Sequence, residues 1–173
     1  MYRDLLESAP GMKKKRADIV EALPVSGNCL ALADLSGMMS VCTKTKDQSR
    51  INVLSALLSM GIAARAAEGH EVGIITPYNA QSRLLHAMAR DLADRGTLQH
   101  KISCATVHQF QGSEKDMIVY DAVDCYRMPY PGMLLSSEQN NYANRLFNVA
   151  MTRAKRETMI SSSKAMSKFF DGM

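Results

Sequence analysis

Two short stretches of the chain combine residue types that could contact a nucleotide. The first, TVHQFQGSEKD, covers residues 106–116, and the second, RLFNVAMTRAK, covers residues 145–155. In the first stretch, Gln111 and Glu114 flank Gly112, where the missing side chain lets the backbone come close to a ligand. The carboxylate of Glu114 suits a ribose hydroxyl or a water molecule better than a phosphate. This pattern indicates a turn beside a charged ligand.

The second stretch contains Arg153, the strongest candidate for chemistry in the chain. An arginine guanidinium can stabilise charge on a phosphoryl group while that group is transferred, as arginine fingers do. An arginine near a helix C-terminus can instead bond the last carbonyl groups and complement the helix dipole. Residues 114–116, taken alone, could likewise form an ordinary solvated charged turn.

A third stretch, IITPYNAQ at residues 74–81, is typical of a strand that ends before a proline and leads into a helix. Asn79 suits the N-cap of that helix. In the functional interpretation, Thr76 and Tyr78 face a ligand, and the tyrosine ring stacks on a base. In the simpler interpretation, this is an ordinary strand–turn–helix junction with a partly buried tyrosine.

The first stretch begins with two further candidates for contact with a nucleic acid. Thr106 and His108 alternate with Val107, so we expect both to point to one side at the end of a strand. A hydroxyl and an imidazole placed there can donate hydrogen bonds to phosphate oxygens. His108 alone could equally be a loop histidine whose hydrogen bonds are satisfied within the protein.

Other catalytic patterns are absent from the sequence. The chain contains neither GxxxxGK[ST] nor GxGxxG, and the acidic residues supply no convincing magnesium-binding DExx motif. Its four cysteines lack zinc-site spacing, so we predict no metal site, buried thiols and a reducing compartment. Without a phosphate-cradling loop, neither stretch could split a triphosphate alone.

The composition is that of a folded domain. The chain has 173 residues, of which 46% are hydrophobic and 22% charged. No apolar run is long enough for a membrane span and the N-terminus lacks a secretion signal, so we expect a soluble cytoplasmic protein without membrane contact. The net charge of +4 is compatible with binding a polyanion but does not require it.

Short apolar strands alternate with amphipathic helices along the chain. We expect strands at residues 29–35, 71–76, 101–107, 117–123 and 157–162, helices at 49–67, 79–95, 138–154 and 164–170, a short strand within the loop at 38–46, and a loop at 126–137. The alternation predicts a parallel sheet with helices on both faces. Because such sheets bind ligands at the carboxyl ends of their strands, we expect all the candidate segments at that edge.

Together, the three stretches resemble a set of helicase motifs. IITPYNAQ resembles motif IV of superfamily 1 helicases, TVHQFQGSEKD resembles motif V and RLFNVAMTRAK resembles motif VI. Their order and spacing also match those of the branch containing the nonsense-mediated-decay helicase and the Okazaki-fragment nuclease-helicase. The resemblance extends from about residue 28 to about residue 170.

The resemblance implies a fold and a domain division. Members of that family have two RecA-like domains of the P-loop NTPase type, and this chain resembles only the second. We therefore expect a three-layer α/β/α domain with a mainly parallel sheet at residues 28–173. Residues 1–27 would form a linker or a partial N-terminal extension.

The resemblance also implies ligands and roles. ATP and Mg²⁺ would be held mainly by the first RecA-like domain, with Arg153 reaching the γ-phosphate from across the cleft. Gln111, Gly112 and Glu114, and with them Arg145, would lie near the phosphates and ribose, although the family often has two arginines before the leucine that follows Arg145. The residues implied to contact single-stranded DNA or RNA are Thr76, Pro77, Tyr78, Thr106 and His108.

The functional hypothesis is the second motor domain of an ATP-dependent helicase or translocase, inactive alone. One alternative is a non-catalytic RecA-like module that binds nucleic acid or protein. Another is an unrelated nucleotide-binding α/β enzyme, which would need a glycine-rich loop after the first strand. Residues 34–37 (DLSG) match such a loop poorly.

Overall fold

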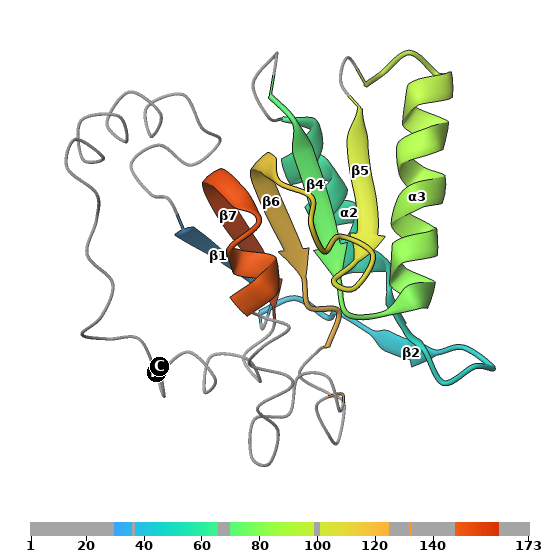
Figure 1. Ribbon diagram of the computed structural model, residues 1–173. Coiled ribbons are helices and arrows are strands. Elements are labelled where there is room, and N and C mark those ends of the chain that lie inside the picture. Colours follow the sequence, from blue (N-terminus) through green and yellow to red (C-terminus); the bar gives the residue numbers. More distant parts are fainter. Residues whose placement is uncertain are drawn as a thin grey trace, which may run out of the picture.

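The central element of the protein is a five-stranded parallel sheet. The computed structural model describes residues 30–35, 37–65, 70–98, 101–124, 132 and 148–162, with side chains up to residue 154 (Figure 1). The strands are β1 (Leu30–Asp34), β4 (Val72–Thr76), β5 (Ile102–Thr106), β6 (Lys115–Asp121) and β7 (Ala154–Ser162). Their order in the sheet is β1-β7-β6-β4-β5, and every neighbouring pair is parallel.

Two helices cover one face of this sheet. They are α2 (Val53–Ala64) and α3 (Asn79–Asp94). Alternate strand residues such as Val72 and Ile74 point to them, and they pack on buried residues including Ala56 of α2 and Leu85 of α3. This packing follows from the period of two in strands, which turns every second side chain to the same face. The α/β architecture is that of a RecA-like domain, as the sequence predicts.

The other face is covered, within the described residues, by two short segments. Residues 107–114 cross the sheet between β5 and β6, and residues 148–151 form a helical turn before β7 (Figure 1). Phe110 and Ala150 belong to the buried cluster on this side. The Phe110 ring lies against Gly73 of β4, where an added Cβ would come within 2.6 Å of the ring. Glycine at this position therefore makes room for the crossing segment.

The predicted start of the first helix, at residue 49, is wrong. The helix begins at Val53, because residues 50–52 form the strand β3 (Arg50–Asn52), which pairs antiparallel with β2 (Cys42–Lys44). Asn52 then caps the helix, since its side chain accepts a hydrogen bond from the Ser55 amide at 3.1 Å. The short strand expected within residues 38–46 is present as β2.

The end of the predicted helix at 138–154 is also wrong. Residues 148–151 are helical, Thr152 and Arg153 form a turn, and β7 begins at Ala154 instead of residue 157. The reason is pairing with a distant segment, because Ala154 lies opposite Lys115 of β6.

The strand predicted at 29–35 is present as β1 but is not a buried core strand. It pairs only with β7 at the edge of the sheet, and Leu30 and Leu32 are 52% and 51% exposed. The loop predicted at 126–137, except Gly132, and the helix predicted at 164–170 lie outside the described residues. Within the described part of the chain, no helix has both the length and the hydrophobicity that crossing a bilayer requires.

Candidate functional site

The predicted site residues fall into two groups at opposite edges of the sheet. Thr76, Pro77, Tyr78, Thr106 and His108 follow the carboxyl ends of β4 and β5, and we call them the carboxyl-edge group. Gln111, Gly112, Glu114 and Arg153 lead to the amino ends of β6 and β7, and we call them the amino-edge group. Arg145 lies outside the described residues.

The expectation that all candidate segments share the carboxyl edge is therefore wrong. Strands β5 and β6 are both parallel to β4 and lie on either side of it. The segment that joins them must return from the carboxyl edge to the amino edge, and residues 107–114 make that return. A single motif thus begins at one edge of the sheet and ends at the other.

Backbone pairing brings the members of the amino-edge group together. The Lys115 amide donates a hydrogen bond to the Arg153 carbonyl oxygen at 3.0 Å, so Glu114 and Arg153, which directly precede the adjacent strands β6 and β7, lie close to one another. Gly112 has a φ of +87°, a conformation that favours glycine, and the space where a Cβ would stand is open. Gln111, Gly112 and Glu114 are all exposed. This corner of the sheet is open to a ligand from solvent.

The Arg153 side chain is half-buried and bonded to its own turn. Its Nε donates to the Val149 carbonyl at 3.2 Å, and its Nη2 donates to the Thr152 hydroxyl at 3.3 Å. These contacts satisfy the end of the helical turn, as expected of an arginine with a structural role. They use two of the five N–H donors of the guanidinium. The remaining donors could bind an anion at the same edge.

The carboxyl-edge group contains a tyrosine that is buried instead of presented to solvent. Tyr78 is 8% exposed, and its hydroxyl donates to Oδ1 of Asp124 at 3.2 Å. Stacking of this ring on a base does not fit the structure. Tyr78 is also the N-cap residue of α3, the position predicted for Asn79, and it makes no side-chain cap bond.

The two threonines of the carboxyl-edge group are also buried. Thr76 is 0% exposed and Thr106 is 5% exposed. The Thr106 hydroxyl donates to Oε1 of Gln109 at 3.1 Å, and the Thr106 amide donates to the same oxygen at 3.1 Å. These side chains hold the turn together. Pro77 is half-buried and His108 is exposed, so these two residues are the members of the group that reach solvent.

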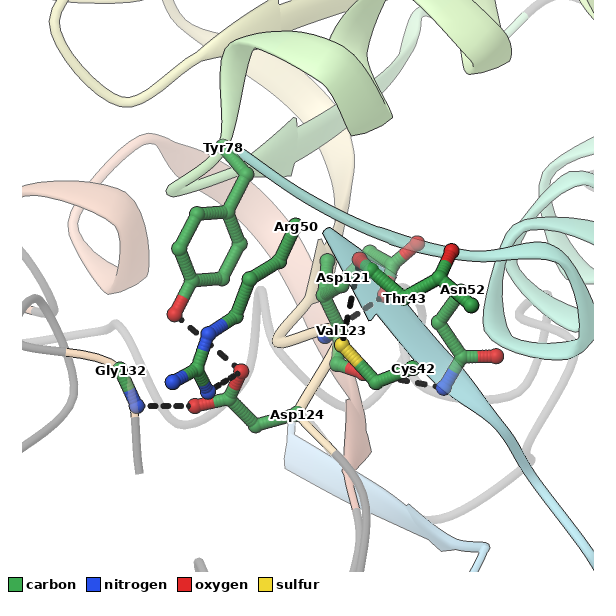
Figure 2. Close-up of polar contacts among 9 residues, drawn as sticks. All are labelled: Cys42, Thr43, Arg50, Asn52, Tyr78, Asp121, Val123, Asp124 and Gly132. Carbon is green, nitrogen blue, oxygen red and sulfur yellow. Dashed lines mark hydrogen bonds and ion pairs between the residues drawn. The ribbon is translucent and has the colours of Figure 1, made fainter. Parts of the chain in front are cut away.

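A buried ion pair beneath the carboxyl edge was not predicted from the sequence. Arg50 of β3 donates from Nη1 to Oδ1 of Asp124 at 2.6 Å, and their side chains are 10% and 2% exposed (Figure 2). The Arg50 guanidinium lies 5.9 Å from the centre of the Tyr78 ring. Burial, together with the nearby Asp124 carboxylate, raises the pKa of Tyr78 above its ordinary value, so the hydroxyl stays protonated as a donor.

Gly132, eight residues after Asp124, contacts the same ion pair. Its amide donates to Oδ2 of Asp124 at 2.6 Å, and a Cβ at this position would overlap the Tyr78 hydroxyl (Figure 2). Asp124 therefore accepts hydrogen bonds from three separate segments of the chain. One local sign of this arrangement is visible in the sequence, an aspartate directly after the predicted apolar strand at 117–123, but no pattern identified its partners.

A second buried polar cluster connects β3, β6 and α3. Gln81 is fully buried, and its amide nitrogen donates to Oδ2 of Asp121 at 2.7 Å and to the Asn52 carbonyl at 2.9 Å. The backbone amide of Asn52 donates back to Oε1 of Gln81 at 3.0 Å. Asn52 also donates from Nδ2 to the Val123 carbonyl at 2.9 Å. Paired in this way, the buried polar groups fix the turn that follows β4 in one position.

The residues present fit one side of a site for ATP, the cofactor implied by the motif resemblance. The amino-edge group offers an open glycine turn, a carboxylate and a guanidinium. Among the residues that the structure describes, no group of three or more His, Cys, Asp or Glu side chains could hold a metal ion. The amino-edge group could therefore contact one side of a nucleotide.

Comparisons with known proteins agree with the motifs. Residues 1–165 match the family described as AAA domain. The chain is 32% identical over 131 residues to a regulator of nonsense transcripts 1 homolog of Arabidopsis thaliana, covering 75% of this chain and 10% of that protein. It is 29% identical over 121 residues to the DNA polymerase alpha-associated DNA helicase A of Schizosaccharomyces pombe, covering 68% of this chain and 16% of that protein.

A third relative has a name similar to that of the first. The putative regulator of nonsense transcripts 1 of Takifugu rubripes is 32% identical over 130 residues, covering 75% of this chain and 11% of that protein. The chain thus spans about a tenth to a sixth of the length of these relatives. From the family match, the parallel α/β fold and these relatives, we conclude that the chain belongs to the AAA domain family, in the superfamily 1 branch of helicases.

Proposed function

We propose that this chain is the second motor domain of an ATP-dependent helicase or translocase. In this proposal, a first motor domain holds ATP and Mg²⁺, and this chain completes the nucleotide site from the opposite side. The observation that carries the proposal is the pairing of the Lys115 amide with the Arg153 carbonyl, which brings the glycine turn and the arginine to one corner. We also propose that the whole protein hydrolyses ATP and acts on nucleic acid.

Arg153 is the proposed arginine finger. Its guanidinium would leave the Val149 carbonyl and turn to the γ-phosphate when the two domains close. ATP supplies the phosphoryl group whose transfer to water drives the motor. Gly112 would approach the phosphates with its backbone amide, Gln111 would approach them with its side-chain amide because its backbone amide donates to the His108 carbonyl, and Glu114 would accept a hydrogen bond from the ribose.

The carboxyl edge is the proposed contact surface for single-stranded DNA or RNA. His108 and Pro77 reach solvent there, whereas Thr76, Tyr78 and Thr106 support them from below. The segment at 107–114 carries His108 near its start, and its end lies beside Arg153. This continuity offers a direct mechanical connection between the nucleic-acid contact and the nucleotide contact. The buried thiol of Cys104 is in keeping with a reducing, cytoplasmic setting.

ATP turnover by the protein that contains both motor domains tests the finger. Replacing Arg153 by alanine should slow turnover by about 10³-fold or more, as for other arginine fingers. Arg153→Lys should remain strongly impaired, because lysine keeps the charge but lacks the planar fork. The matched control is Arg95→Ala, since Arg95 is an exposed arginine that bonds Asp91 on the surface of α3.

The outcomes separate a chemical role from a structural one. Thermal unfolding of each variant should show that the Arg153 variants remain folded at the assay temperature. Turnover by Arg153→Ala within a few-fold of the unchanged protein would refute the finger. The isolated chain should hydrolyse no ATP with or without single strands, and measurable turnover by it would contradict the division of the site between two domains.

One observation favours a second candidate function. The hydrogen bonds from Arg153 to Val149 and Thr152 already give the arginine a structural role. A RecA-like module that binds nucleic acid and hydrolyses nothing would retain these bonds and the carboxyl-edge surface. The same ATPase assay decides between the two, because this candidate predicts that no ATP turnover depends on Arg153.

A further inference from the structure

A surface cavity lies between α3 and the edge strand β5, outside both groups of predicted site residues. Its volume is about 530 Å³. One wall consists of Asn79, Ser82, Arg83 and His86 of α3, and the opposite side consists of Cys104 and Ala105 of β5 with Gln109 from the following turn. The α3 residues recur at three- and four-residue steps, so they share one face of the helix.

The lining is rich in hydrogen-bond donors. Asn79, Arg83 and His86 are exposed, and the side chains of Asn79, Ser82 and His86 have no hydrogen-bond partner among the described residues. Oε1 of Gln109 already accepts from Thr106, so its amide nitrogen is the group that can donate to a ligand. A ligand that carries several acceptor oxygens would satisfy these groups together.

The electrostatics of the cavity favour an anion. The side chain of Arg83 is 71% exposed, and its ion pair with Asp47 is long at 3.8 Å, with the Asp47 side chain 78% exposed. Such a pair contributes little, so the guanidinium can exchange Asp47 for another anion. No lining residue is acidic. Burial raises the pKa of Cys104 to about 12, so its thiol adds no negative charge at neutral pH.

The cavity is continuous with the carboxyl edge. Gln109, one of its lining residues, is bonded to Thr106 and follows His108 directly. Asn79, another, follows Pro77 and Tyr78 at the end of β4. A strand of nucleic acid that contacts Pro77 and His108 would therefore meet the mouth of the cavity with its next phosphates.

We propose that the cavity between α3 and β5 binds a phosphodiester of single-stranded nucleic acid, with Arg83 and His86 as its main contacts. This inference rests on the proposed function of the carboxyl edge and extends the strand path beyond it. A free phosphate or a mononucleotide offers the same oxygens, so the experiment includes both as separate ligands.

The test is the binding of fluorescently labelled single-stranded oligonucleotides to the 173-residue chain, followed by anisotropy at several salt concentrations. Arg83→Gln should weaken binding about three- to tenfold, and the slope of log K against log[salt] should become shallower by about 0.7, the value of one lost phosphate contact. His86→Gln should weaken binding in the same direction. Arg90→Gln is the matched control, because Arg90 is exposed on α3 but pairs with Asp94 away from the cavity.

Each outcome has a definite meaning. If the unchanged chain binds strands and Arg83→Gln binds them as well as Arg90→Gln does, the cavity inference is wrong and the proposed function stands. If the unchanged chain binds no single strand even at about 50 mM salt, the nucleic-acid surface and the cavity inference both fail. If inorganic phosphate or a mononucleotide displaces the strand only from the unchanged chain, the inference is supported. If either ligand binds in an Arg83-dependent manner while strands bind independently of Arg83, the cavity serves a small anion and the inference is overturned.

Discussion

Replacing Asp124 by alanine should be among the most destabilising single changes in this domain. The carboxylate accepts from Arg50 at 2.6 Å, from the Tyr78 hydroxyl at 3.2 Å and from the Gly132 amide at 2.6 Å. Its side chain is 2% exposed, so water cannot replace it. Removing one partner of a buried ion pair costs about 3–5 kcal/mol, because the other charge stays buried without compensation. That loss is a large part of the total stability of about 5–15 kcal/mol of a typical domain.

A double-mutant cycle separates the ion pair from the other two bonds. Urea unfolding should be measured for the unchanged chain, Asp124→Ala, Arg50→Met and the double variant. Because the double variant buries no lone charge, it should be less destabilised than the sum of the single variants by about 0.5–3 kcal/mol. If Asp124→Ala does not fold, Asp124→Asn replaces it in the cycle, since asparagine keeps an acceptor for Gly132 and loses the charge.

Two results would refute this reasoning. One is a loss of less than about 1 kcal/mol for Asp124→Ala, a value typical of exposed pairs. The other is strict additivity in the cycle, which would mean that Arg50 and Asp124 do not stabilise one another. An unchanged urea m-value across the variants would show that the comparison concerns the folded state.

Two further predictions concern packing and pH. Gly73→Ala should destabilise the domain by about 1–3 kcal/mol, because the new Cβ would approach the Phe110 ring to 2.6 Å and Ile118 Cδ1 to 3.0 Å. Chemical unfolding should show that adding Phe110→Leu partly restores the lost stability. A Gly73→Ala variant as stable as the unchanged chain would contradict the packing. The pKa of the buried Cys104 thiol is raised from 9.0 to about 12, so the folded state favours the neutral thiol and this contribution is present below about pH 9 and lost as the pH rises toward 12. Between pH 8 and pH 10.5, the melting temperature of Cys104→Ala should fall less than that of the unchanged chain, and equal falls would refute the assignment.

Local sequence pattern was sufficient to predict the central strands of the sheet. β4 and β6 are short apolar runs buried on both faces, and such runs are typical of central parallel strands. The amphipathic period likewise predicted α3 closely, since Arg95 and Gly96 end the helix as expected. These elements depend on periodicity within one segment, which a sequence displays directly.

Contacts with other segments of the chain, near or distant, account for the errors. Arg50 to Asn52 form a strand because β2 is beside them, and Ala154 joins a strand because Lys115 is beside it. The burial of Tyr78 depends on Asp124, which lies 46 residues away in the chain. None of these partners can be identified from local periodicity or turn residues.

The division of the site between two edges was also beyond the sequence. Residues 107–114 read as a turn, and a turn of eight residues can reverse direction or cross a sheet. The order of β5, β4 and β6 in the sheet decides between these possibilities. The pairing of Gly73 with Phe110 then shows where the crossing segment lies.

The most direct test of the account is a comparison of two variants in the protein that contains both motor domains. ATP turnover and single-strand affinity should be measured for Arg153→Ala and for His108→Ala. The account predicts that Arg153→Ala loses turnover but binds strands normally, and that His108→Ala weakens strand binding while turnover without strands stays unchanged. Loss of both properties together in each variant would contradict the assignment of the two edges to two ligands.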